Sequence, residues 1–142
     1  MRFSAASGAV AVSFFTLFGF IFLMTQYFQF VRGYGPLSAG VRLLPVALSV
    51  AVGSVAGTQL AVRAGTKLIV TTGLVAMAAF YGWVAATTSA TLSYGIIAVQ
   101  MVLYGLGMGL TSAPATESIM GAISRAKAGV GSAVNDLSLI HI

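Results

Sequence analysis

Few side chains in this sequence could carry out acid–base, nucleophilic or metal chemistry. The 142 residues include one histidine, two carboxylates and no cysteine. The histidine, His141, is the second-to-last residue and stands alone, so we assign it no role. The carboxylates, Glu117 and Asp136, are not spaced with other groups as a nucleophile–base pair, a metal site or a phosphate-binding loop. We therefore expect no enzyme activity, no cofactor and no metal site.

Two apolar stretches each carry a row of amide, aromatic or small polar residues at helical spacing. The first row is Phe15, Phe22, Gln26 and Gln29, and the second row is Gln100, Tyr104, Gly107 and Thr111. An uncompensated amide is costly in hydrocarbon, so both rows are expected to face other helices or a water-filled cavity. Hydrogen bonding between helices is one interpretation. The other is a path for large, flat, lipophilic or cationic compounds, lined by Gln26, Gln29, Gln100 and Tyr104.

The composition indicates the environment in which these rows must be positioned. Hydrophobic residues make up 58% of the chain and charged residues only 6%, with a mean hydropathy of +1.01. A soluble globular domain carries about 25% charged residues, so this chain cannot cover a water-facing surface. The net charge is +5, but the basic residues are scattered and form no patch for nucleic acid. The sequence therefore predicts an all-α integral membrane protein in contact with the lipid bilayer.

Long charge-free runs predict four membrane-spanning helices. A span needs about 20 mainly apolar residues, and the last run is long enough for two spans divided by a polar cluster at 87–91. The expected helices cover about residues 8–31, 41–62, 68–86 and 94–116, and a further helix begins after residue 128.

Basic residues predict the orientation of these spans. Arg2, Arg63, Lys67, Arg125 and Lys127 fall on one side of the membrane, and Arg32 and Arg42 fall on the other. Cytoplasmic loops carry the excess of Lys and Arg, so we expect the N-terminus in the cytoplasm. The expected location is the cell inner (plasma) membrane, with several passes.

The two carboxylates are candidate proton carriers, because an ionisable residue in or near a span is costly and usually functional. Glu117 ends the last predicted span and follows Pro114, where simple hydration of a helix end is the alternative interpretation. Asp136 would be intramembrane if the Gly-rich segment 128–136 begins a fifth helix.

Glycines at small-xxx-small spacing predict close helix packing. One pair is Gly53 and Gly57, and the other is Gly105 and Gly109, with Pro114 one turn further on. Such pairs let helix backbones approach each other in a membrane, and ordinary bundle packing is sufficient to explain any single pair.

Four segments resemble motifs of one transporter family. Phe22–Gly40 reads FLMTQYFQFVRGYGPLSAG and resembles the QY-Q--RGYSPL-AG signature of major facilitator superfamily drug:proton antiporters, in the fourteen-helix branch of the EmrB/QacA type. Arg63–Lys67 resembles the second-half copy of the loop motif of that family. Gly105–Pro114 resembles its glycine-and-proline motif, and Ala126–Asp136 resembles the loop before the next helix.

This resemblance implies that residues 1–136 are part of the C-terminal six-helix bundle of a longer protein, with the N-terminal bundle absent. The implied function is proton-coupled export of lipophilic or cationic compounds by alternating access. Within the resemblance, Arg63, Gly65 and Lys67 form a tight cytoplasmic turn that acts in gating.

The last six residues depart from the family pattern. Leu137–Ile142 reads LSLIHI, which matches the translation of a transposon end used in sequencing adapters, so we interpret 137–142 as a non-native tail. Two other classes remain open: a small exporter that assembles from four-helix subunits, and a non-transporting membrane subunit.

Overall fold

The computed structural model describes residues 2–87, 92–121, 129, 132–133 and 136. These residues are helical apart from short connections, and no strand occurs among them. In chain order the elements are α1 (Arg2–Gln26), the π-helical turn η1 (Tyr27–Val31), α2 (Pro36–Arg42), α3 (Leu44–Ala64), α4 (Thr66–Thr87) and α5 (Tyr94–Gly121).

Four helical segments are long and apolar enough to cross a membrane, which confirms the predicted all-α membrane fold. They are Ser4–Val31, Pro36–Ala64, Thr66–Thr87 and Tyr94–Gly121. The first helix begins before residue 8, and the last continues beyond residue 116. A charged residue ends the apolar span, but it does not end the helix, because its backbone can still form the next hydrogen bond.

The second span is divided at Leu43, between α2 and α3. Pro45 lies in the first turn of α3, where its missing N–H costs nothing. In an uninterrupted helix its ring would clash with the carbonyl group of Val41, so the helix ends and begins again.

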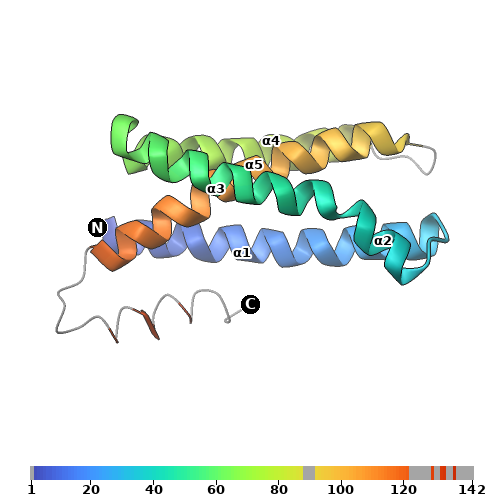
Figure 1. The fold of residues 1–142 in the computed structure, drawn as a ribbon, viewed down its shortest axis with the longest axis horizontal. Coiled ribbons are helices and arrows are strands. Elements are labelled where there is room, and N and C mark those ends of the chain that lie inside the picture. Colours follow the sequence, from blue (N-terminus) through green and yellow to red (C-terminus); the bar gives the residue numbers. More distant parts are fainter. Residues whose placement is uncertain (1, 88–91, 122–128, 130–131, 134–135, 137–142) are drawn as a thin grey trace.

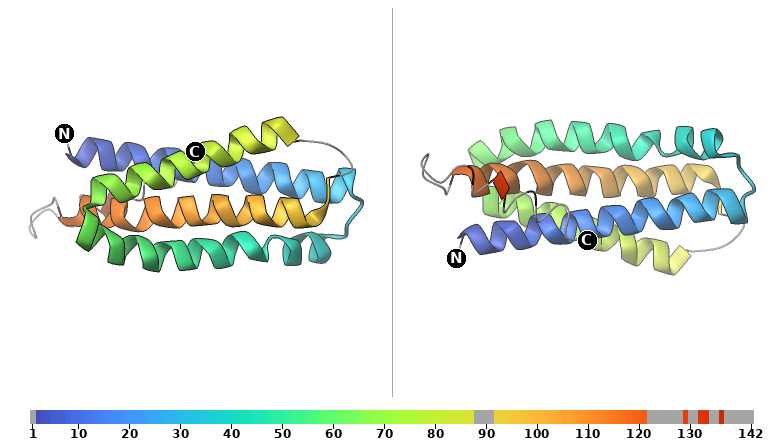
Figure 2. Two further views of the ribbon diagram at one scale, coloured as in Figure 1. Left: turned by 90° about the horizontal axis from the view of Figure 1, so that it is seen from above. Right: turned by 90° about the horizontal axis from the view of Figure 1, so that it is seen from below.

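Helix α5 is the central element. Figure 2 shows α5 between α3 on one side and α1 with α4 on the other, and α5 packs most extensively against α3, then α4, then α1. Figure 1 shows the start of α1, the α3–α4 turn and the end of α5 at one end, called here the Arg63 end. The α1–α2 turn, the end of α4 and the start of α5 lie at the opposite, Arg32 end.

The buried core follows from this arrangement. Met101, Tyr104, Ala115 and Ile119 of α5 are fully buried. Phe20 of α1 packs in one cluster with Met101 and Tyr104, and Val10 of α1 packs in a second cluster with Ala115 and Ile119. The outer face of α1 is not buried in this way. It exposes large apolar side chains such as Phe15, Phe18 and Phe22, as a surface in contact with lipid or with another protein would.

Two expectations fall mostly outside the described residues. Of the helix expected after residue 128, only Gly129, Ser132, Ala133 and Asp136 are described, each with helical backbone. The proposed non-native tail, 137–142, lies outside the described residues.

Candidate functional site

Four glycines bring α3 and α5 into backbone contact. A methyl group on Gly53 would lie 2.8 Å from the carbonyl oxygen of Leu106, and one on Gly109 would lie 2.5 Å from that of Val50. For Gly105 the nearest atom is the carbonyl oxygen of Val46 at 2.6 Å, and for Gly57 it is the Cα atom of Leu110 at 3.0 Å. No side chain fits here, so the two predicted glycine pairs form one seam, called here the α3–α5 seam.

A second glycine contact, between α4 and α5, was not predicted. A methyl group on Gly107 would lie 2.8 Å from the carbonyl oxygen of Gly73, and one on Gly73 would lie 2.6 Å from that of Gly107. We call this contact the α4–α5 seam. Gly73 has no glycine four residues away in its span, so it forms no small-xxx-small glycine pair and was not predicted.

The second polar row lies in the packed interior. The Tyr104 hydroxyl donates to Oγ1 of Thr16 on α1 at 3.3 Å, and the Tyr81 hydroxyl of α4 donates to the Thr16 carbonyl oxygen at 2.8 Å. The Tyr104 ring stacks on Phe20 with centroids 4.7 Å apart. Gln100 is buried, and its Nε2 donates to Oγ1 of Thr87 at 3.0 Å. The side chains of this row thus join α5 to α1 and α4.

The first polar row is not continuous with the second. Gln26 ends α1 and Gln29 lies in η1, and both are half-buried. Phe15 and Phe22 of the same row are 64% and 62% exposed, so this row faces outward over much of its length.

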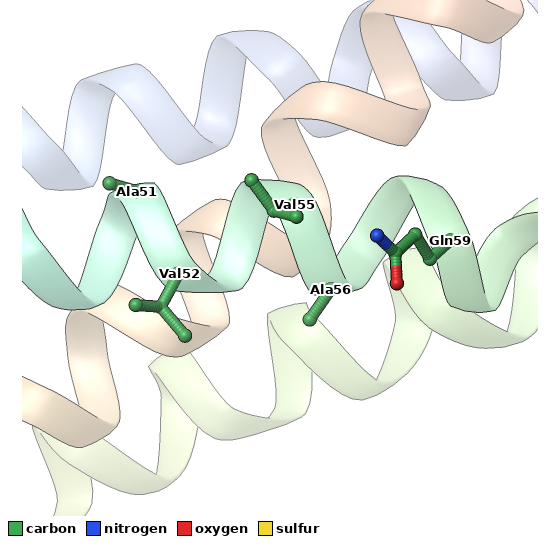
Figure 3. A pocket seen from close by; sticks show the side chains of 5 residues that line it. All are labelled: Ala51, Val52, Val55, Ala56 and Gln59. Atoms are coloured by element: carbon green, nitrogen blue, oxygen red, sulfur yellow. The ribbon is translucent and has the colours of Figure 1, made fainter.

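A further amide, Gln59, was missed by the sequence analysis. It is exposed on α3 and lines a shallow, mostly apolar depression with Ala51, Val52, Val55 and Ala56 (Figure 3). The sequence feature that could have identified Gln59 is that it is the single glutamine in the second predicted span. It was missed because it forms no row with other polar residues.

The Arg63–Lys67 segment forms the turn between α3 and α4. Arg63, Gly65 and Lys67 are exposed, and α4 begins directly after Gly65. The backbone of Gly65 has φ of +87°, a region that favours glycine, and its N–H donates to the Ala61 carbonyl oxygen at 3.0 Å. Space around Gly65 is open, so its backbone conformation is what requires glycine.

Both candidate proton carriers are exposed. Glu117 lies near the end of α5, at the Arg63 end, and Asp136 follows α5 in the chain. Pro114, one turn before Glu117, is buried inside α5, and its Cγ would be 3.4 Å from a methyl group on Gly57.

Three apolar spans packed around a fourth, central one, with amides inside the spans, define a multi-pass membrane protein. Its relatives are drug exporters and resistance proteins. The chain is 30% identical over 136 residues to the multidrug efflux pump LfrA of Mycolicibacterium smegmatis, covering 96% of this chain and 27% of LfrA. It is 30% identical over 132 residues to the multidrug resistance protein Stp of Mycobacterium tuberculosis, a match that covers 93% of this chain and 24% of Stp. It is 34% identical over 125 residues to the methyl viologen resistance protein SmvA of Salmonella typhimurium, a match that covers 87% of this chain and 25% of SmvA.

The chain thus spans about a quarter of the length of the curated relatives that it matches. No family model matches the chain. No solved structure matches it.

Proposed function

We propose that this chain is a segment of a proton-coupled multidrug efflux transporter of the major facilitator superfamily. The observation that carries the proposal is the similarity of nearly the whole chain to one segment of several proteins named for drug efflux or resistance. The proposed cargo is a lipophilic or cationic small molecule. The proposed partner is the N-terminal bundle of the longer protein, against which this part rocks in alternating access.

In this proposal the substrate path runs along the side of α1 and η1 that bears Gln26 and Gln29. Both amides are half-buried within an apolar span, where an amide without a polar partner is costly. Gln100 and Tyr104 stand behind the path, where their interhelical contacts hold α5 against α1 and α4.

Gating is assigned to the turn formed by Arg63, Gly65 and Lys67. Gly65 alone connects α3 to α4, so a displacement of one helix is expected to move the other. Glu117 and Asp136 are the proposed proton carriers, since they are the two carboxylates of the chain.

The proposed orientation puts the Arg63 end in the cytoplasm of an inner-membrane protein. Arg63 and Lys67 are exposed there. Arg32 and Arg42, at the opposite end, lie over tyrosine rings and bond to neighbouring oxygens. In the sequence, five of the seven basic residues fall on the Arg63 side of the spans and two on the Arg32 side, so the positive-inside rule favours a cytoplasmic Arg63 end.

The absence of native cysteine makes a substrate-protection experiment possible. We define the LfrA chimera as LfrA with residues 3–136 of this chain in place of its matching segment. In a cysteine-free LfrA chimera, a cysteine at Gln26 should react with a water-soluble maleimide. Tetraphenylphosphonium, a lipophilic cation, should slow that reaction several-fold.

Val12→Cys is the matched control, because Val12 is exposed on the same helix among apolar residues. It should react slowly with or without the cation. Equal reaction rates at the two positions, or no protection at Gln26, would contradict the proposed path.

A further inference from the structure

Arginine and tyrosine side chains gather at the Arg32 end around one buried ring. Phe28 is 1% exposed, and its ring centroid lies 5.8 Å from that of Tyr27, 6.0 Å from that of Tyr34 and 6.4 Å from that of Tyr94. Arg32 lies over the ring of Tyr27, and Arg42 lies over the rings of Tyr34 and Tyr94. We call Tyr27, Phe28, Arg32, Tyr34, Arg42 and Tyr94 the tyrosine–arginine cluster.

Arg42 is held as a planar, oriented cation. Its guanidinium carbon lies 3.9 Å from the ring centroid of Tyr34 and 5.9 Å from that of Tyr94. Its Nη1 donates to the carbonyl oxygen of Ser38 at 3.2 Å and also to Oγ of Ser38. The Tyr94 hydroxyl donates to the Arg42 carbonyl oxygen at 3.1 Å, which fixes the backbone of the same residue.

Arg32 is also fixed, with its guanidinium carbon 5.5 Å from the ring centroid of Tyr27. Its Nε donates to the Tyr27 hydroxyl at 3.0 Å, and its Nη2 donates to the carbonyl oxygen of Leu92. Both guanidinium groups are therefore oriented before any ligand arrives.

These contacts leave donors and charge unused. Arginine has five N–H donors, and the bonds above leave Nε and Nη2 of Arg42 and Nη1 of Arg32 without a protein acceptor among the described residues. The oxygen atoms of Tyr27, Ser38 and Leu92 that accept these hydrogen bonds are all neutral. Glu117 lies at the opposite end of the molecule, and Asp136 is bonded to neither arginine.

The surface beside Arg42 is apolar. Leu37 is 83% exposed and Val41 is 56% exposed, and they lie one turn apart on α2, next to Arg42. Tyrosines at a span end are typical of the membrane interface, where headgroup phosphates lie above acyl chains. An oriented guanidinium fork matches a phosphate geometrically, and the Leu37–Val41 face matches an acyl chain.

We propose that the tyrosine–arginine cluster binds the phosphate of an anionic phospholipid, with its acyl chain along Leu37 and Val41. The lipid supplies the negative charge that the chain lacks at this end. This site does not depend on transport, so it stands or falls separately from the proposed function.

The test measures phospholipid retained by the purified 142-residue chain in native mass spectrometry from nonionic detergent. Phosphatidylglycerol, phosphatidylcholine and inorganic phosphate are added separately. The chain should retain phosphatidylglycerol in preference to both others. Arg32→Gln/Arg42→Gln should weaken this retention about tenfold, whereas the control Arg63→Gln/Lys67→Gln, which removes the same charge, should stay within about twofold of the original chain.

Circular dichroism reports whether each variant keeps its helices. Arg42→Lys keeps the charge and loses the planar fork, and it should reduce retention about threefold, so the proposal remains testable even if the double variant unfolds. Equal retention by Arg42→Lys and the original chain would overturn the site, as would an equal loss in the Arg63/Lys67 control. Phosphate binding without a preference for phosphatidylglycerol would overturn the lipid as its ligand.

Discussion

Thr16 is the residue on which two tyrosines from two other helices converge. Tyr104 of α5 donates to its side chain, and Tyr81 of α4 donates to its backbone carbonyl oxygen. Helical spacing placed Tyr104 on a polar row, but spacing does not identify the helix that faces the row. Thr16 is a small residue in an apolar stretch, so the sequence did not predict it as the partner of these tyrosines.

The contribution of the Thr16–Tyr104 hydrogen bond can be isolated with Thr16→Val and Tyr104→Phe. Each variant removes one partner and nearly conserves volume, so the coupling between them in a double-mutant cycle should be about 0.6 kcal/mol, as is typical of hydrogen bonds between membrane helices. The measurement is thermal unfolding of the chain in detergent. Additive effects of the two substitutions would show that the bond contributes nothing.

Gly65 makes a different kind of prediction, because it depends on backbone conformation alone. Gly65 has φ of +87° and ψ of 139°, a backbone conformation in which valine is strained by roughly 1–3 kcal/mol, so Gly65→Val should distort the α3–α4 turn. In the LfrA chimera we expect reduced transport of a fluorescent cation with normal membrane insertion. Gly82→Val, which lies on α4 with open space around it, is the control and should transport normally. Unchanged transport by Gly65→Val would remove the gating role.

At the scale of elements, α5 contacts its neighbours in two ways. It meets α3 and α4 through the α3–α5 and α4–α5 seams, where backbones touch and no methyl group fits. It meets α1 through large side chains, including the stacked rings of Phe20 and Tyr104. Interfaces of backbone atoms have no rotamers to adjust, so we expect α3, α4 and α5 to move as one unit and α1 to be the element that repacks.

Gly109→Ala tests the first kind of contact. The added methyl group would lie 2.5 Å from the Val50 carbonyl oxygen and from the Ser54 nitrogen, so α3 must shift, at a cost of about 1–3 kcal/mol. The thermal midpoint of the chain in detergent should fall. Gly82→Ala is the matched control, and it should be neutral or stabilising because alanine is the better helix former. A Gly109→Ala midpoint equal to that of Gly82→Ala would contradict the α3–α5 seam.

For the molecule as a whole, the charges and the polar cluster at 87–91 were sufficient to predict the number of spans. The charge-free runs became helical, and the last run divided into α4 and α5, because a chain with so few charged residues has no other way to satisfy its backbone in lipid. The tertiary neighbours were not predictable, since Gly73 lacks a motif and Gln59 stands alone. Helix ends were also misplaced, since α1 begins at Arg2 and not near residue 8, and α5 continues beyond residue 116 to Gly121. Apolar length and charge report the limits of the hydrocarbon and not of the helix.

The proposed orientation predicts which end of the chain meets the outside. In intact cells a membrane-impermeant maleimide should label a cysteine at Gly35, which is exposed at the Arg32 end. A cysteine at Lys67 should be labelled only after permeabilisation. The reverse pattern would show that the Arg63 end faces outward.

The central claim is that these helices work as one segment of a drug exporter. Its most direct test is the rate at which energised cells making the LfrA chimera export ethidium, compared with cells making intact LfrA or no transporter. We predict uncoupler-sensitive export by the chimera, well above that of cells without a transporter. A chimera that inserts as abundantly as active LfrA and yet exports no ethidium would contradict the claim.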